Sequence, residues 1–209
     1  MSPILYRLSP RLVLCSRKDP YEPGPEERAL LLETGAAFPL GHPTTRLCLE
    51  LLREAIAAGR MKRLLDVGCG TGVLALAAAA LGVPLAVGVD LSLDAARVTL
   101  ENARVNGLAG RVHTAQGSTE CLKGPFDLVA ANLPWEVQLD QAPELDRLAG
   151  PAGRLLLSGF RENQEEPLLT TYRKLGRSLA QRLIKPFHHP ELPKDLSFTW
   201  VAWLLGGKS

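Results

Sequence analysis

The chain has 209 residues, of which 46% are hydrophobic and 22% are charged, which suits one globular domain with a substantial core and excludes a largely disordered chain. Its formal net charge of +2 at pH 7 argues against a large nucleic-acid-binding surface. Because the chain has neither a run of 18 uninterrupted apolar residues nor the basic-then-apolar start of a signal peptide, the sequence predicts a cytoplasmic protein with no membrane partner.

The first 42 residues are expected to form an extension ahead of the main domain. Two short strands are predicted at residues 4–8 and 11–15, and residues 16–27 concentrate proline and charge in the manner of a linker. A helical spacing of apolar residues then begins at residue 44 and continues to residue 59, with Thr44 or Thr45 as the predicted N-cap. We therefore divide the chain into an N-terminal extension, 1–42, and a domain, 43–209.

Strands and helices alternate from residue 63 onward. Apolar runs predict strands at 63–67, 84–90, 111–116, 126–132 and 153–159, and helical spacing predicts helices at 72–82, 92–107, 141–150 and 164–176. Such alternation, with continuously apolar strands, is typical of a parallel sheet covered by helices on both faces. Two more strands, at 178–187 and 198–205, follow each other without a helix, so one of them should be antiparallel. The basic residues from Arg173 to Arg182 are interpreted as a solvated helix face.

The predicted fold class is therefore α/β: a doubly wound, Rossmann-like, seven-stranded sheet that is mostly parallel, with one antiparallel strand near the C-terminus. Ligands of such sheets bind outside the carboxyl ends of the strands. The residues that follow the predicted strands are consequently the first place to search for a site.

Three glycines, Gly68, Gly70 and Gly72, stand within five positions directly after the strand at 63–67. Glycine is costly there unless the backbone needs a positive φ or a ligand must approach it closely. Asp90 ends the next strand about 20 residues later, where an acid can bond the hydroxyls of a ribose. This spacing alone is compatible with a dinucleotide. Asp66, two residues before Gly68, favours S-adenosylmethionine instead, because a carboxylate there would repel a pyrophosphate and suits a ligand that carries an ammonium group.

At these residues, in the stretches DVGCGTGVLAL and VGVDLS, the chain resembles the class I S-adenosylmethionine-dependent methyltransferases. The resemblance implies S-adenosylmethionine as cofactor, with its methionine part against the glycine loop, its ribose on Asp90 and its adenine beside Leu91. The implied cofactor contacts are Asp66, Gly68, Gly70, Gly72, Asp90, Leu91, Gly117, Ser118 and Asn132.

The strand at 126–132 ends in Asn-Leu-Pro-Trp, which resembles the N-P-P-Y type motif of methyltransferases that modify amine or amide nitrogens, with Leu133 and Trp135 as departures. Methyl transfer is an in-line displacement, so the main task is to hold a nitrogen lone pair behind the methyl group. Asn132 can accept N–H bonds and orient that lone pair, Pro134 fixes the turn, and Trp135 can pack on the substrate. We predict Asn132, Pro134 and Trp135 as catalytic; a turn beside a core tryptophan is the alternative.

A closer resemblance runs from about residue 38 to residue 205. AAFPLGHPTTRLCLELL, APELDRLAGPAGRLLLSGF and the closing WVAWLL are similar to the catalytic domain of the ribosomal-protein methyltransferase family that acts on large-subunit protein eleven. It implies a cofactor contact at Thr44, although Pro39, Leu40 and Gly41 replace the family's glycine–threonine stretch. It also implies a protein substrate, a ribosomal protein being one candidate. Fewer than 40 residues precede the matched region, where the family has a separate docking domain, so we expect the chemistry to carry over and the substrate to differ.

No metal site is predicted, because the four cysteines form no C-x-x-C pair and the histidines are scattered. Cys48 and Cys69 are interpreted as small core residues. His42 either takes a proton from the acceptor amine or bonds to the backbone ahead of a helix, and His188 and His189 fall in a predicted surface turn. The sequence thus predicts an S-adenosylmethionine-dependent N-methyltransferase acting on a protein. An RNA-base N-methyltransferase and a cofactor-binding scaffold without catalysis are the alternatives.

Overall fold

The computed structural model describes residues 4–19, 21–33, 41–59, 61–187 and 197–208. Its centre is a seven-stranded sheet with the order β6-β5-β4-β7-β8-β10-β9. The strands are β4 (Arg63–Val67), β5 (Leu85–Asp90), β6 (Val112–Gln116), β7 (Leu128–Asn132), β8 (Arg154–Arg161), β9 (Leu179–Phe187) and β10 (Phe198–Leu205). Strands β4 to β8 are parallel, and β10 is antiparallel to both of its neighbours. This confirms the predicted α/β class and its single antiparallel strand near the C-terminus.

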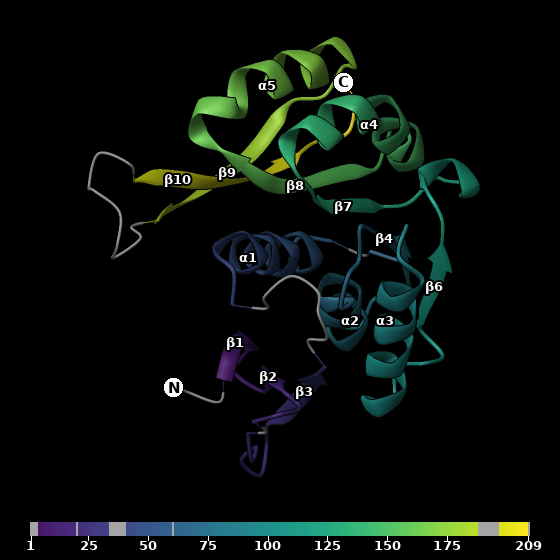
Figure 1. The fold of residues 1–209 in the computed structure, drawn as a ribbon, viewed down its shortest axis with the longest axis vertical. Helices are drawn as coiled ribbons and strands as arrows, with labels where there is room; N and C mark the ends of the chain where they lie inside the picture. The colour runs from purple at the N-terminus through teal and green to yellow at the C-terminus, as the bar shows by residue number, and fades with distance from the viewer. Residues whose placement is uncertain (1–3, 20, 34–40, 60, 188–196, 209) are drawn as a thin grey trace.

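Helices cover both faces of this sheet (Figure 1). One face carries α1 (Pro43–Ala57), α2 (Val73–Ala80) and α3 (Leu93–Val105). The other face carries α4 (Trp135–Ala149) and α5 (Glu165–Lys174). Two short 3-10 helices, η1 (Thr119–Cys121) and η2 (Glu162–Gln164), stand between these elements in the chain. Leu64 joins the core under α1 and α2, whereas Leu65 joins the core under α4 and α5, because successive strand side chains point to opposite faces. In the described ranges, no helix is long and apolar enough to cross a membrane.

The helix starts follow from the chemistry of the residues before them. Ser92 caps α3 through its hydroxyl, as predicted. The cap of α1 is neither Thr44 nor Thr45 but His42, whose Nδ1 accepts from the Thr44 backbone N–H at 3.3 Å. Pro43 occupies the first helical position, where its missing N–H would have had no helical partner.

Two helical predictions need correction. Helix α4 begins at Trp135, six residues before the predicted start, and contains Pro143 in its interior. The basic stretch near α5 is not one solvated face, because α5 ends at Lys174 and Arg177 is buried. The Arg177 Nε donates to Asp146 at 2.7 Å, so the buried guanidinium is charge-paired.

The N-terminal residues form a second, smaller sheet of β1 (Ile4–Ser9), β2 (Leu12–Ser16) and β3 (Arg28–Leu32), in that order. Strand β3, which pairs in parallel with β2, was not predicted. Leucines of all three strands, Leu8, Leu14, Leu30 and Leu32 among them, join the core cluster under α1 and α2, and Figure 1 shows the small sheet beside these helices. The division of the chain at residue 42 stays a prediction.

Two buried asparagines, Asn102 of α3 and Asn106 directly after it, bond to the outer edge of β3. The Asn106 amide accepts from the Leu31 N–H at 2.8 Å and donates to the Leu31 carbonyl at 2.7 Å. Asn102 accepts from the Glu33 N–H at 2.8 Å and donates to the Glu33 carbonyl at 3.2 Å and to the Thr71 carbonyl at 3.0 Å. Four helical residues advance about 6 Å and two strand residues about 6.6 Å, so the two spacings match. Helix α3 thereby joins the small sheet to the glycine loop.

Candidate functional site

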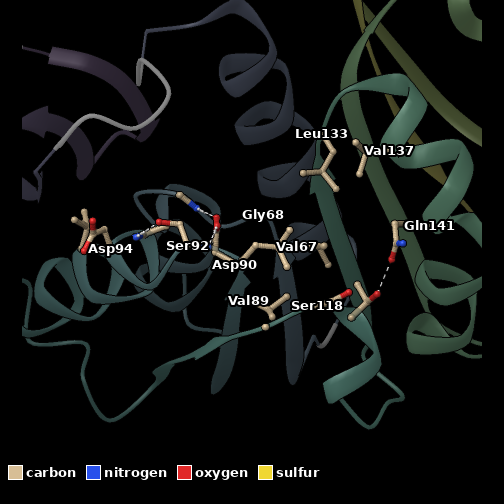
Figure 2. Close-up of a pocket in the computed structure, with 16 residues that line it drawn as sticks. Val67, Gly68, Val89, Asp90, Ser92, Asp94, Ser118, Leu133, Val137 and Gln141 are labelled. Carbon is tan, nitrogen blue, oxygen red and sulfur yellow. Dashed lines mark hydrogen bonds between the residues drawn. The ribbon is translucent and has the colours of Figure 1, made fainter.

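The carboxyl ends of β4, β5, β6 and β7 open into two adjoining cavities, at the edge where doubly wound sheets bind ligands. The large cavity, about 660 Å³, extends from the glycine loop past Asp90 to α4 (Figure 2). The small cavity, about 390 Å³, extends from the same loop to His42 and Trp200. Part of the lining is common to both cavities: Gly68, Gly70 and Leu133.

The three glycines of the loop all have positive φ, at 67°, 54° and 76°, but for different reasons. A Cβ at Gly68 would collide with the Leu133 side chain, and one at Gly72 would lie 2.5 Å from the Thr99 methyl carbon. A Cβ at Gly70 would meet nothing within 4 Å, because this residue faces open cavity. Gly72 lines neither cavity, so the structure gives it a packing role at the start of α2 rather than the predicted ligand contact.

Asp90 connects the glycine loop to the end of β5. One carboxylate oxygen accepts from the Gly70 N–H at 3.0 Å, and the other accepts from the Ser92 N–H at 2.9 Å. Figure 2 shows Asp90 between Ser92 and the Gly68 end of the loop, on the wall of the large cavity. Since each carboxylate oxygen has a further lone pair, Asp90 can still accept from the hydroxyls of a ligand.

The far part of the large cavity has apolar walls and a polar rim. Leu91, which is 74% exposed, and Val137 lie at its opening, and Gly117 and Ser118 follow β6 as predicted. The Gln141 side chain, which sequence reasoning missed, accepts from the Thr119 hydroxyl at 2.7 Å, as Figure 2 shows. Apolar walls with polar groups at the edge suit a planar heteroaromatic ring. The polar contacts themselves come from η1 and α4. The remaining lining residues of the large cavity include Val67, Val89, Ala95 and Val98.

Asp66 lines the small cavity and is 3% exposed. Its carboxyl accepts from the Ala75 N–H at 3.1 Å, at the start of α2. Burial, with a smaller contribution from the charge of Asp90, raises the pKa of Asp66 to about 8. The carboxyl is therefore mainly protonated near pH 7, and a cationic group placed beside it would favour the ionised form.

Asn132 ends β7 and lines the small cavity. Its side-chain carbonyl oxygen is buried and has no hydrogen-bond partner in the part of the chain that the structure describes. Leaving such an acceptor unpaired costs about 1–3 kcal/mol, so a ligand N–H would satisfy it. Pro134 lines the same cavity, but Trp135 lines neither cavity and packs against the core under α4 and α5. The structure thus does not place the Trp135 ring against a substrate, as the motif had suggested.

A buried glutamine, which the sequence gave no reason to select, fixes the turn after Asn132. The Gln138 Nε2 donates to the Leu133 carbonyl at 2.7 Å and to the Ser158 carbonyl at 2.6 Å. Gly159 approaches the same turn so closely, with φ of 100°, that a Cβ there would collide with the Leu133 backbone. Contacts from α4 and β8 therefore hold the Asn132 turn in one conformation.

The rings of His42 and Trp200 form the remaining wall of the small cavity, with centroids 5.0 Å apart in an edge-to-face arrangement. The Trp200 Nε1 is buried without a hydrogen-bond partner among the described residues. Burial lowers the pKa of His42, so the ring is neutral near pH 7, and its contact to the Thr44 N–H supports the capping interpretation. Thr44, the predicted cofactor contact, also lines the cavity. Trp200 was missed because its run of residues predicts only a strand.

Three other predictions concern cysteines, histidines and the altered loop. Cys48 and Cys69 are buried, as predicted. Across the described ranges, no group of three or more His, Cys, Asp and Glu side chains is placed to hold a metal ion. His188, His189, Pro39 and Leu40 lie outside the described residues.

Comparison with known proteins gives a consistent set of relatives. The family model described as ribosomal protein L11 methyltransferase (PrmA) matches residues 3–184, which includes the small sheet ahead of the expected start near residue 38. The ribosomal protein L11 methyltransferase of Sorangium cellulosum (strain So ce56) is 44% identical over 161 residues, covering 77% of this chain and 51% of the relative. The chain spans about half the length of the curated relatives it matches.

Among solved structures, the ribosomal protein L11 methylase of Lactobacillus delbrueckii subsp. bulgaricus superposes with a TM-score of 0.78 at 23% identity, covering 97% of both chains. The magnesium protoporphyrin IX methyltransferase of Synechocystis PCC 6803, solved with bound S-adenosylmethionine, has a TM-score of 0.61 at 19% identity, covering 78% of both chains. At these identities, the structural likeness establishes a shared fold.

Proposed function

The chain belongs to the ribosomal protein L11 methyltransferase (PrmA) family, and from this premise we propose that it transfers a methyl group from S-adenosylmethionine to an amine nitrogen of a protein. The observation that carries the proposal is the buried, unpartnered Asn132 carbonyl oxygen in a cavity that adjoins the glycine loop. An amine N–H is the kind of donor that this oxygen lacks. A ribosomal protein is the first substrate to test, because the relatives are named for one.

The chemistry of the two cavities fits S-adenosylmethionine from end to end. Its ammonium group suits the buried Asp66 carboxyl in the small cavity, its ribose hydroxyls suit Asp90, and its adenine suits the apolar part of the large cavity beside Leu91 and Ser118. When bound, S-adenosylmethionine supplies a methyl group made electrophilic by a sulfonium sulfur. A pyrophosphate beside Asp66 would gain no ion pair from that carboxyl, whereas an ammonium group would, which supports the choice over a dinucleotide.

The residues around Asn132 would prepare the acceptor nitrogen. The Asn132 oxygen accepts one N–H and thereby orients the lone pair, and Gln138 keeps the turn that carries Asn132 from moving. A lysine amine has an ordinary pKa of about 10.4, so it must lose a proton before it attacks. Enclosure between the neutral His42 ring and Trp200 disfavours the ammonium form and helps that loss.

The proposal is tested by transfer of labelled methyl groups from S-adenosylmethionine to purified ribosomal protein L11 and, separately, to a bacterial lysate. Protease and nuclease digestion then show which material holds the label. Label that disappears with protease supports the proposal. Label that disappears with nuclease supports the RNA-base alternative. Absence of label together with firm binding of S-adenosylhomocysteine supports the scaffold.

A further inference from the structure

Arg161 ends β8 next to the small cavity. Gly159, two residues earlier on the same strand, lines that cavity, and Trp200, which also lines it, is directly opposite Arg161 on β10. The guanidinium carbon of Arg161 lies 4.0 Å from the centroid of the Phe198 ring and 5.7 Å from that of Trp200. The Arg161 side chain thus lies over two aromatic rings at the edge of the small cavity.

A neighbouring arginine shows what is unusual about Arg161. The Arg182 guanidinium lies 2.6 Å from Glu162 and 2.6 Å from Glu165, so its charge is matched within the protein. Arg161 is exposed, and no carboxylate of the described residues lies within ion-pairing distance of it. A guanidinium that stacks on a ring keeps its in-plane N–H groups available for a carboxylate. Arg161 therefore presents a positioned donor group that no described carboxylate occupies.

A second cation lies on the other side of Trp200. Lys185 of β9 is directly opposite Trp200 in the β9–β10 pairing, is exposed, and has no ion pair with a described carboxylate. Residues that are directly opposite in neighbouring strands point to the same face of the sheet. Arg161, Trp200 and Lys185 therefore form one surface, here called the cationic strip, across β8, β10 and β9.

We propose that an acidic segment of the acceptor protein binds across the cationic strip while its amine enters the small cavity. This inference rests on the proposed function, since it concerns the substrate of that same site. Two cations suit one or two carboxylates better than the repeated charge of a nucleic acid. The Trp200 ring also meets His42 and Phe198 edge to face, at 5.0 Å and 5.1 Å, in addition to carrying Arg161, so these neighbours already occupy part of the ring on which a base would stack.

The test measures binding rather than turnover. Two fluorescein-labelled ten-residue peptides each contain one lysine, flanked by glutamates in one peptide and by glutamines in the other. Both are titrated with the protein by fluorescence anisotropy, at low salt and with S-adenosylhomocysteine present. We expect the glutamate peptide to bind about three- to tenfold more tightly, as new charge-assisted contacts at an exposed surface allow. The difference should shrink at high salt.

The variants Arg161→Gln and Lys185→Gln should each bring the ratio of the two peptide affinities closer to one. Arg161→Lys should keep only part of the preference, because lysine keeps the charge and loses the planar guanidinium fork. The matched control is Arg104→Gln, which removes the same charge from the exposed last turn of α3, outside both cavities, and should keep the full preference.

Equal affinity for both peptides, no measurable binding of either, or a preference that survives Arg161→Gln would overturn the proposal. A single-stranded RNA oligonucleotide that binds more tightly than the acidic peptide, and is weakened by Arg161→Gln, would overturn it in favour of a nucleic acid. Failure of the proposed function is seen separately, as absence of methyl transfer. If the protein prefers the acidic peptide but transfers no methyl group, binding at the cationic strip is supported and the proposed methyltransferase activity is refuted.

Discussion

The loops after β4 and β7 shape adjoining cavities by different means. After β4, the backbone makes the shape: three glycines adopt positive φ, and the Gly70 amide holds the Asp90 carboxylate. After β7, distant side chains and a distant glycine make it: Gln138 from α4 and Gly159 from β8 fix a turn that contains no glycine. A binding loop made by its own backbone is visible in the sequence, whereas one fixed by residues from other elements is not. Substitutions in the two loops should accordingly act on different steps.

The largest effect is expected in the β7 loop, from Asn132→Ala. Removing the amide takes away the group that orients the acceptor nitrogen, so turnover should fall by about two to three orders of magnitude. The dissociation constant of S-adenosylhomocysteine should change by less than about threefold, because the lost contact is made to the acceptor. Methyl transfer to the acceptor found by labelling gives the rate, and calorimetry gives the affinity. Full activity would show that the Asn-Leu-Pro-Trp motif is only a turn.

In the β4 loop, Gly70→Val should weaken S-adenosylhomocysteine binding by at least about a hundredfold while the fold persists. A β-branched residue resists the φ of 54°, and its methyl groups would occupy open cavity. Gly82→Val is the matched control: Gly82 also has positive φ and open space around its Cβ position, but it lines neither cavity. The control should lose similar stability in thermal unfolding and keep its affinity. Equal loss of affinity in both variants would contradict the assignment of Gly70 to the site.

Asp90→Ala should have an intermediate effect. Hydrogen bonds to a charged acceptor contribute about 1.5–3 kcal/mol, so the affinity for S-adenosylhomocysteine should fall about ten- to hundredfold. The hydrogen bond from the Gly70 N–H is lost as well, so the contact between the glycine loop and the end of β5 is weakened. Asp94→Ala, at the rim of the same cavity with a side chain 91% exposed, should stay within about threefold. Calorimetric titration of both variants with S-adenosylhomocysteine measures these affinities. An unchanged affinity in Asp90→Ala would show that Asp90 does not contact the ligand.

The smallest expected effect is a pH dependence of S-adenosylhomocysteine affinity, which arises from Asp66 in the small cavity. The Asp66 pKa of about 8 means that the carboxyl is mainly protonated at pH 7, and an ammonium ligand favours its ionised form. Binding therefore releases a proton below pH 8, and affinity should rise with pH, by at most about tenfold between pH 6.5 and 7.5. Asp66→Asn should remove the slope. An affinity that falls over this range would place the ligand ammonium elsewhere.

The parts of the fold that could be predicted are those written in consecutive residues. Continuous apolar runs gave the strands of the large sheet, and the Gly68–Gly72 spacing with Asp90 gave the loop that faces both cavities. Strand β3 was not predicted, and it depends on pairing with β2 and on the amides of Asn102 and Asn106, which are distant in the sequence. Trp135 was selected for its proximity in sequence to Asn132, whereas Trp200, 68 positions away, is brought to the small cavity only by the sheet order, which the sequence does not show.

The contact between α3 and β3 has a consequence for self-association. The outer edge of a sheet presents N–H and C=O groups that can recruit a strand from another molecule, which is a common route to aggregation. At Leu31 and Glu33 these groups are already bonded to the amides of Asn106 and Asn102. The asparagine amides at and just after the end of α3 therefore take the place that a foreign strand would need at this edge of β3.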